Sequence, residues 1–143
     1  MFRSKKISSK INWIDIQSID ALTIAVESSE SSAVLLFKHS TRCSISTLAK
    51  SRIEMHWNNQ LQLKPYLIDV LRNRDVSNQI ADYFNVRHES PQALVIISMK
   101  CKGSFSHNSI EMQKIEAIIG SWLSTFQRGI VSFFFTSVNL SWP

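Results

Sequence analysis

The chain has 143 residues, of which 44% are hydrophobic and 19% are charged, and it carries a formal net charge of +5. This length and composition predict one globular domain with a full hydrophobic core. Beyond residue 38 the charges are scattered and no ladder of basic and aromatic residues appears, which argues against nucleic acid as a partner. No apolar run approaches the roughly 18 residues of a membrane-spanning helix, so no membrane partner is expected.

The first half of the chain predicts a basic arm and then two helices around a buried strand. Residues 1–12 are expected to be a flexible basic arm, and residues 13–14 a short edge strand or an anchoring contact. Ser18 is suited to cap a helix whose apolar residues recur at helical spacing. The continuous apolar run over residues 33–38 is typical of a strand buried on both faces, and helical spacing resumes after Ser44.

The second half of the chain predicts further strands, a hairpin and two helices. Early strands that alternate with helices favour parallel pairing, whereas the terminal hairpin adds an antiparallel strand. We therefore expect an α/β protein with a thioredoxin-like fold over residues 13–123, in which a central mixed sheet of about four strands is flanked by helices. The expected elements are a strand over residues 66–70 opened by Pro65, a helix capped by Asp75 or Ser77, a strand over residues 93–98, a hairpin turn over residues 100–103, a returning strand over residues 104–107, and a last helix that starts at the capping pair Asn108 and Glu111.

Residues 124–143 are predicted to be an apolar C-terminal extension outside the thioredoxin-like domain. Within it, residues 129–138 are strongly apolar and β-prone. Three roles stay open from the sequence: an added strand, a cover for a surface patch, or a homodimer contact. The three consecutive phenylalanines at residues 133–135 must be covered by something, because an exposed segment of this kind promotes aggregation.

Cys43 is the candidate nucleophile of the chain. It follows a predicted strand and precedes a predicted helix, with Arg42 beside it. At a helix N-terminus, unpaired backbone N–H groups and the helix dipole favour the thiolate over the thiol. The second cysteine of a Cys-x-x-Cys motif is replaced by Ser46, whose hydroxyl is placed to donate to the sulfur. A lone thiol attacks a disulfide and holds the mixed product, but it has no neighbouring thiol to release that product.

Other readings of these residues are weaker. Cys43 as an inert core residue conflicts with its polar neighbours, and Cys43 with His39 lacks the further ligands of a metal site, so no metal is expected. His39 is either a general base for Cys43 or a residue that fixes the loop by hydrogen bonding. Cys101 is expected at a hairpin turn, about 20 Å along a strand from Cys43, and without a redox role. Two distant cysteines and no recognisable signal peptide favour a reducing compartment, the cytoplasm.

Three segments carry a family resemblance: residues 37–46, residues 74–78 and residues 88–92. Over roughly residues 13–120 the chain resembles the YtxJ-type monothiol bacilliredoxins. The resemblance implies a thioredoxin-fold oxidoreductase without a bound cofactor, which uses bacillithiol, a cysteine–glucosamine–malate thiol, as co-substrate. The chain departs from the family at Ser44, where proline is common, and in the tail from residue 121 onward.

The resemblance also implies a binding site around the thiol. A cis Pro91 would present the backbone of Ser90 to the cysteinyl amide of the ligand. Positive side chains would meet the malate carboxylates, although an arginine at such a position is more often solvated or structural. The residues expected to bind substrate are Lys38, Thr41, Arg42, Arg74, Ser90 and Pro91, with Arg87 as a further candidate.

The predicted function is that of a monothiol thiol–disulfide oxidoreductase that removes bacillithiol from mixed disulfides on proteins, with Cys43 as nucleophile. Its partners would be bacillithiolated proteins and free bacillithiol. Two alternatives stay open: a generic monothiol module that acts with another low-molecular-weight thiol, and a thioredoxin-like binding domain in which Cys43 is inert. The reactivity of Cys43 separates the last alternative from the others, and the identity of the stable adduct separates the first two.

Overall fold

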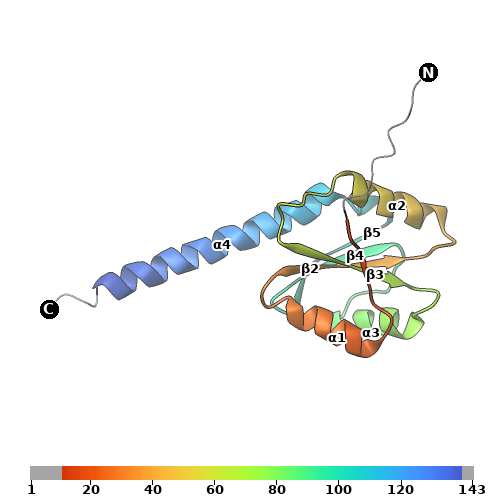
Figure 1. Cartoon of the computed structure of the whole chain (residues 1–143), viewed down its shortest axis with the longest axis horizontal. Helices are drawn as coiled ribbons and strands as arrows, with labels where there is room; N and C mark the ends of the chain where they lie inside the picture. The colour runs from red at the N-terminus through yellow and green to blue at the C-terminus, as the bar shows by residue number, and fades with distance from the viewer. Residues whose placement is uncertain (1–10, 140–143) are drawn as a thin grey trace, which may run out of the picture.

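The computed structural model describes the backbone of residues 11–139 and the side chains of residues 11–129. It contains a five-stranded mixed sheet with helices on both faces (Figure 1). The elements in chain order are β1 (Ile14–Asp15), α1 (Ile19–Ser28), β2 (Ala33–His39), α2 (Ser44–Met55), β3 (Leu63–Asp69), α3 (Arg74–Phe84), β4 (Gln92–Ile97), β5 (Lys100–Ser106), the 3₁₀ helix η1 (His107–Ser109) and α4 (Met112–Asn139).

The sheet has the strand order β1-β3-β2-β4-β5, with β2 at its centre. Strand β2 pairs in parallel with β3 and antiparallel with β4, and β5 completes the antiparallel hairpin. Strand β1 is a two-residue edge strand parallel to β3, which is one of the two roles expected for residues 13–14. The α/β thioredoxin-like architecture is thereby confirmed, with one strand more than the roughly four expected.

Two core clusters lie on opposite faces of the sheet, because side chains alternate along each strand. Phe37 packs with α2 and α4 on one face, whereas Leu36 packs with α1 and α3 on the other. Figure 1 shows this layering, with α2 and the start of α4 above the sheet and α1 and α3 below it. All seven residues of β2 are buried as a result, as the apolar run predicts.

The hairpin turn lies at Ser98 and Met99, so the prediction of a turn over residues 100–103 is wrong. Both turn residues have positive φ, 51° and 62°, although neither is glycine. Ser29 holds them: its backbone oxygen accepts from the N–H of Ser98 at 2.9 Å, and its hydroxyl accepts from the N–H of Met99 at 2.7 Å. A tertiary contact thus stabilises a turn that local sequence preferences do not indicate.

Gly103, which suggested the turn, serves helix packing instead. It lies within β5, where an added Cβ would come within 2.4 Å of the Cδ1 atom of Ile118 on α4. The missing side chain lets the helix approach the strand closely. Cys101 therefore lies in a strand, opposite Ile96, and not at a turn.

Three element starts differ from the prediction. Strand β3 begins at Leu63 and includes Pro65, which is tolerated because β1 pairs only with the two residues that follow it. Helix α3 begins at Arg74, so the expected caps Asp75 and Ser77 lie inside its first turn. Helix α4 begins at Met112, after the short helix η1 that contains Asn108.

The C-terminal extension continues α4 as one helix to Asn139, which excludes the added strand. β-propensity acts mainly through packing on a sheet, and no strand partner holds this segment. The helix has a nucleus to extend, because its first turns pack on the sheet through Ile115 and Ile119. Figure 1 shows the blue end of α4 projecting well past the sheet. In the described part of the chain, no helix has the length and apolar character needed to cross a membrane.

Truncation after Ser124 is expected to leave the fold and the thiol chemistry intact. The side chains of residues 125–129 are exposed, so their removal costs little buried apolar area. Thermal unfolding and the alkylation rate of Cys43, each compared with the full chain, measure this. Size-exclusion chromatography on the same pair shows whether the extension contributes to self-association. Loss of cooperative unfolding would place the extension within the core and move the domain boundary.

Candidate functional site

Cys43 is the N-cap residue of α2, with extended backbone angles of φ −107° and ψ 119°. Its N–H donates to the carbonyl of Ser40 at 3.1 Å, and its own carbonyl accepts the first helical bond from Thr47 at 3.1 Å. The thiol is free and half-buried, and it makes no capping hydrogen bond within the described chain. The thiol therefore lies at the first turn of α2, which is the position that the sequence predicts.

Ser46 ties together the end of β2, the following loop and the first turn of α2. Its buried hydroxyl accepts from the N–H of Ser40 at 3.0 Å and lies 2.6 Å from Nδ1 of His39. Burial, and then Lys50, lower the pKa of His39 against the opposing effects of Asp69 and Glu54. Depending on its tautomer, a neutral imidazole either accepts the hydroxyl proton of Ser46 at Nδ1 or donates to the hydroxyl oxygen, and both arrangements join the two side chains. The structure thus uses this hydroxyl to fix the loop and not to reach the Cys43 sulfur, and His39 takes its loop-fixing role.

Replacing Ser46 with alanine is expected to destabilise the protein by about 1–3 kcal/mol. The change leaves the buried Nδ1 of His39 and the N–H of Ser40 without their partner, and such losses carry the full desolvation cost. Urea unfolding measures the effect. The adjacent exposed Thr47→Ala, which removes a hydroxyl bonded to the Cys43 carbonyl, is the matched control and should change stability by less than about 0.5 kcal/mol. Equal effects of the two substitutions would contradict the assigned role.

The peptide bond between Ser90 and Pro91 is cis, an isomer that the sequence alone leaves open. Gln92 follows immediately and pairs with Lys38 near the end of β2. The cis-proline loop and the loop that carries Cys43 therefore leave the sheet at the same edge. Gln92 shapes the first loop: its Nε2 donates to the carbonyl of Arg87 at 3.0 Å, and its Oε1 accepts from the N–H of Glu89 at 3.4 Å.

Lys38 is completely buried although it lies only five residues before Cys43. Its Nζ is 3.2 Å from Nδ1 of His88, which also lies 3.2 Å from the hydroxyl of Ser77. Burial lowers the pKa of Lys38 to about 8. In this conformation His88 lies between Lys38 and solvent. Substrate therefore cannot reach Lys38, contrary to the contact expected from the sequence.

The other candidate residues lie at the same edge of the sheet and are more accessible. Thr41 and Arg42 are exposed in the loop before Cys43, and Arg74 is exposed as the first residue of α3. Thr41 also lines a cavity of about 190 Å³ together with His39. Sequence reasoning assigned no role to His88, although it belongs to one of the segments that carry the family resemblance.

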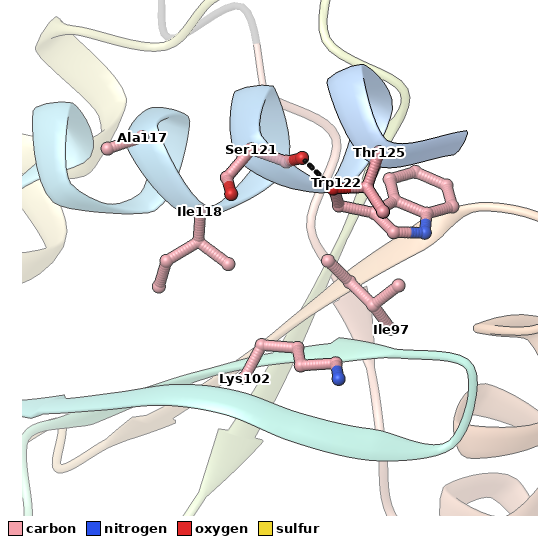
Figure 2. Close-up of a pocket in the computed structure, with 7 residues that line it drawn as sticks. All are labelled: Ile97, Lys102, Ala117, Ile118, Ser121, Trp122 and Thr125. Carbon is pink, nitrogen blue, oxygen red and sulfur yellow. Dashed lines mark hydrogen bonds between the residues drawn. The ribbon is translucent and has the colours of Figure 1, made fainter. Parts of the chain in front are cut away.

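A second cavity, of about 510 Å³, lies far from the thiol between the β4–β5 hairpin and α4. Figure 2 shows Ile97 and Lys102 facing Ile118 and Trp122 across it. Ile97 ends β4, whereas Pro91 lies just before that strand begins, so this cavity is at the opposite edge of the sheet from the cis-proline. It takes no part in the chemistry of Cys43.

Cys101 belongs to the face of the sheet covered by α1 and α3. Its sulfur donates to the carbonyl of Gly103 at 3.4 Å, and burial raises the pKa of this thiol. A raised pKa keeps the group in its unreactive thiol form. Within residues 11–139, no three His, Cys, Asp or Glu side chains gather as metal ligands would.

Comparison with known proteins gives the fold and the family of this chain. Among solved structures, a proposed oxidoreductase with a thioredoxin fold is 28% identical, covers 73% of this chain and 91% of its own, and gives a TM-score of 0.66. Thioredoxin from Trypanosoma brucei brucei, at 17% identity, covers 83% of this chain and 99% of its own with a TM-score of 0.62. Thioredoxin from Malassezia sympodialis, at 16% identity, covers 83% and 97% with a TM-score of 0.59. The last two show the fold alone. The family model for monothiol bacilliredoxin BrxC matches residues 14–115, and the chain therefore belongs to the monothiol bacilliredoxin family.

Proposed function

We propose that this protein is a monothiol thiol–disulfide oxidoreductase that removes bacillithiol from mixed disulfides on other proteins, with Cys43 as nucleophile. The observation that carries the proposal is the position of Cys43. It is a free thiol at the N-terminus of a 12-residue helix, at the sheet edge from which a cis-proline loop also leaves. Membership in the monothiol bacilliredoxin family and the thioredoxin fold support thiol–disulfide exchange as the reaction class.

The reaction proceeds by two exchanges at Cys43. Its thiolate attacks the bacillithiol sulfur of the mixed disulfide, a new disulfide forms between Cys43 and bacillithiol, and the old disulfide breaks. The target cysteine leaves as a thiolate and takes a proton from water. A second bacillithiol thiolate then attacks the bacillithiol sulfur of the adduct, which yields bacillithiol disulfide and returns Cys43 as a thiolate. Each step conserves one disulfide, so no bound cofactor is needed.

The surrounding residues orient the substrate in this proposal. The backbone of Ser90, next to the cis Pro91, is available to pair with the cysteinyl amide of bacillithiol. Exposed Thr41, Arg42 and Arg74 supply hydroxyl and guanidinium groups at the same sheet edge for its carboxylates. The partners are bacillithiolated proteins and free bacillithiol, in the reducing conditions of the cytoplasm.

Intact-mass measurement tests the proposal directly. The reduced protein is incubated with oxidised bacillithiol and, separately, with oxidised glutathione. A bacillithiol adduct on Cys43 that a second bacillithiol discharges, and that forms faster than the glutathione adduct, is the expected result. Equal reaction with both disulfides would favour a generic monothiol module, and no adduct with either would leave an inert thioredoxin-like binding domain.

A further inference from the structure

The central strand carries a buried cation that no carboxylate neutralises. Lys38 is completely buried, and its Nζ has one hydrogen-bond partner among the described residues, the imidazole of His88. An ammonium group has three N–H donors, and burying a charge without a counter-ion is costly. The ion pairs of the described chain lie elsewhere, at Lys50–Glu54, Arg72–Asp69 and Lys114–Glu111.

The residues around Lys38 add positive charge. Burial, and then Lys38 and Arg74, lower the pKa of His88, so Arg74 lies near this imidazole. Glu89 opposes them, but its carboxylate accepts the hydroxyl hydrogen bond of Ser106 on β5. Lys38 and Arg74 thus both lie near the imidazole of His88, and the carboxylate of Glu89 is bonded to a strand at the edge of the sheet.

An unpaired hydroxyl lies in the same loop. Among the described residues, Ser90 holds the one buried side-chain oxygen without a hydrogen-bond partner. Such groups are rare in folded proteins and call for an explanation. Ser90 is two residues from His88 and immediately precedes the cis Pro91, so it lies in the loop that covers Lys38.

His88 is placed as a removable cover over this group of donors. Its side chain is exposed, and it lies in the loop between α3 and β4. Its Nδ1 is shared between Lys38 and Ser77, each at 3.2 Å, so neither contact is a short bond. Rotation of an exposed side chain is fast and inexpensive compared with movement of the strand beneath it.

We propose that Lys38, Arg74 and Ser90 form a carboxylate-binding subsite, which opens when the side chain of His88 turns away from Lys38. Lysine and arginine side chains beside a hydroxyl donor suit an incoming carboxylate, since charge-assisted hydrogen bonds are the strongest of their kind. The assignment of the ligand rests on the proposed function: the carboxylate is that of the malate moiety of bacillithiol.

The position of the subsite fits such a ligand. Lys38 pairs with Gln92, directly after Pro91, and Cys43 follows Lys38 by five residues. A ligand whose sulfur meets Cys43 beside Pro91 can therefore extend along the loop toward His88. Its carboxylate would replace the imidazole as the partner of Lys38 and supply the missing counter-ion.

Binding of L-malate to the Cys43→Ser protein tests the subsite without thiol chemistry. The imidazole signals of His88, followed by NMR, should shift saturably with malate and remain unchanged with the uncharged diamide of malate. In the same background, Lys38→Met should weaken binding about tenfold or more, as expected for a lost charged hydrogen bond. Lys64→Met, a half-buried lysine at the other end of the sheet, is the matched control and should bind as the parent does.

His88→Ala makes the test specific. If His88 covers the subsite, its removal should strengthen malate binding, whereas if His88 is a structural partner of Lys38, its removal should weaken malate binding. Removal of a cover saves the cost of displacing it, so malate should bind more tightly, as measured by calorimetry. Weaker binding to His88→Ala, equal binding of inorganic phosphate and malate, or no saturable shift with malate would each overturn the proposal. Because His88 is exposed, this variant also decides the matter if Lys38→Met does not fold.

Exchange kinetics separate failure of the subsite from failure of the proposed function. The rate of adduct formation on Cys43 is measured with oxidised bacillithiol and with the uncharged 2-hydroxyethyl disulfide. The subsite requires the ratio of the two rates to fall in Lys38→Met and to stay constant in Lys64→Met. An unchanged ratio in Lys38→Met, with a bacillithiol adduct still formed, overturns the subsite alone. Malate binding without any bacillithiol adduct would support the subsite and overturn the proposed function.

Discussion

Replacement of Cys43 by serine is expected to abolish thiol–disulfide exchange, whereas replacement of Cys101 by serine should leave exchange at the wild-type rate. Strand β4 begins at the cis-proline loop and runs away from the edge where Cys43 lies. Along β4, the residues paired on β2 run from Lys38, near the Cys43 loop, to Val34, which is opposite Ile96. Ile96 in turn pairs with Cys101 on β5. Four residues of strand cover about 13 Å, whereas a disulfide needs Cα atoms within about 7 Å.

The two substitutions are compared by the rate of adduct formation with a small disulfide and by peptide mapping under non-reducing conditions. Cys101→Ser also tests whether the buried thiol contributes to stability, which thermal unfolding reports separately. Finding a disulfide between Cys43 and Cys101 within a folded monomer would contradict the strand order and the monothiol route together. Residual exchange in Cys43→Ser would identify Cys101 as a second nucleophile.

Much of the fold follows from local patterns in the sequence. The apolar run that forms β2 and the helical spacing after Ser44 are periodic signals, and each predicts its element without knowledge of the rest of the chain. Together they place Cys43 at a strand-to-helix junction, which is the central feature of the site. The cis Pro91 could be expected only through the family resemblance, since an X–Pro bond in a folded protein is usually trans.

The errors arise where distant segments decide the local structure. Gly103 reads as a turn residue, but it makes room for Ile118 on α4, and the true turn is held by Ser29. The apolar tail is β-prone, yet it continues α4 as a helix to Asn139. Ser46 reads as a donor to the Cys43 sulfur, but its hydroxyl bonds to His39 on the preceding strand. None of these partners is a near neighbour in the sequence.

The sequence carries a signal for the burial of Lys38, because residues 33–38 read as a strand buried on both faces. Val34 and Leu36 face the cluster formed with α1 and α3. Lys38 lies two residues after Leu36, so its side chain points to the same face of the sheet. A lysine near a strand end is ordinarily expected to extend into solvent. Here the loop that carries His88 closes over it, and the position of that loop depends on tertiary structure.

The buried charge of Lys38 makes a large and specific pH dependence of stability expected. Its pKa falls from 10.5 to about 8 on folding. Between these values the unfolded chain holds a proton that the folded protein has released, so the free energy of unfolding rises with pH. The stabilisation is complete above pH 10.5 and is lost as the pH falls through about 8, and its size is about 3 kcal/mol. At neutral pH the folded protein therefore bears the whole cost of burying this charge.

Lys38→Met isolates this contribution, because methionine fills similar space without a charge. The difference in free energy of unfolding between Lys38→Met and wild type should be most favourable to the variant near pH 7. It should shrink by about 3 kcal/mol between pH 8 and pH 10.5 as wild type gains stability. Urea unfolding across this range measures it, with Lys64→Met as the control for the loss of one positive charge. A difference that stays constant with pH would mean that Lys38 keeps its proton in the folded protein, held by a partner other than His88. The expected slope would instead establish that the folded protein buries a destabilising cation near the end of β2, five residues before Cys43.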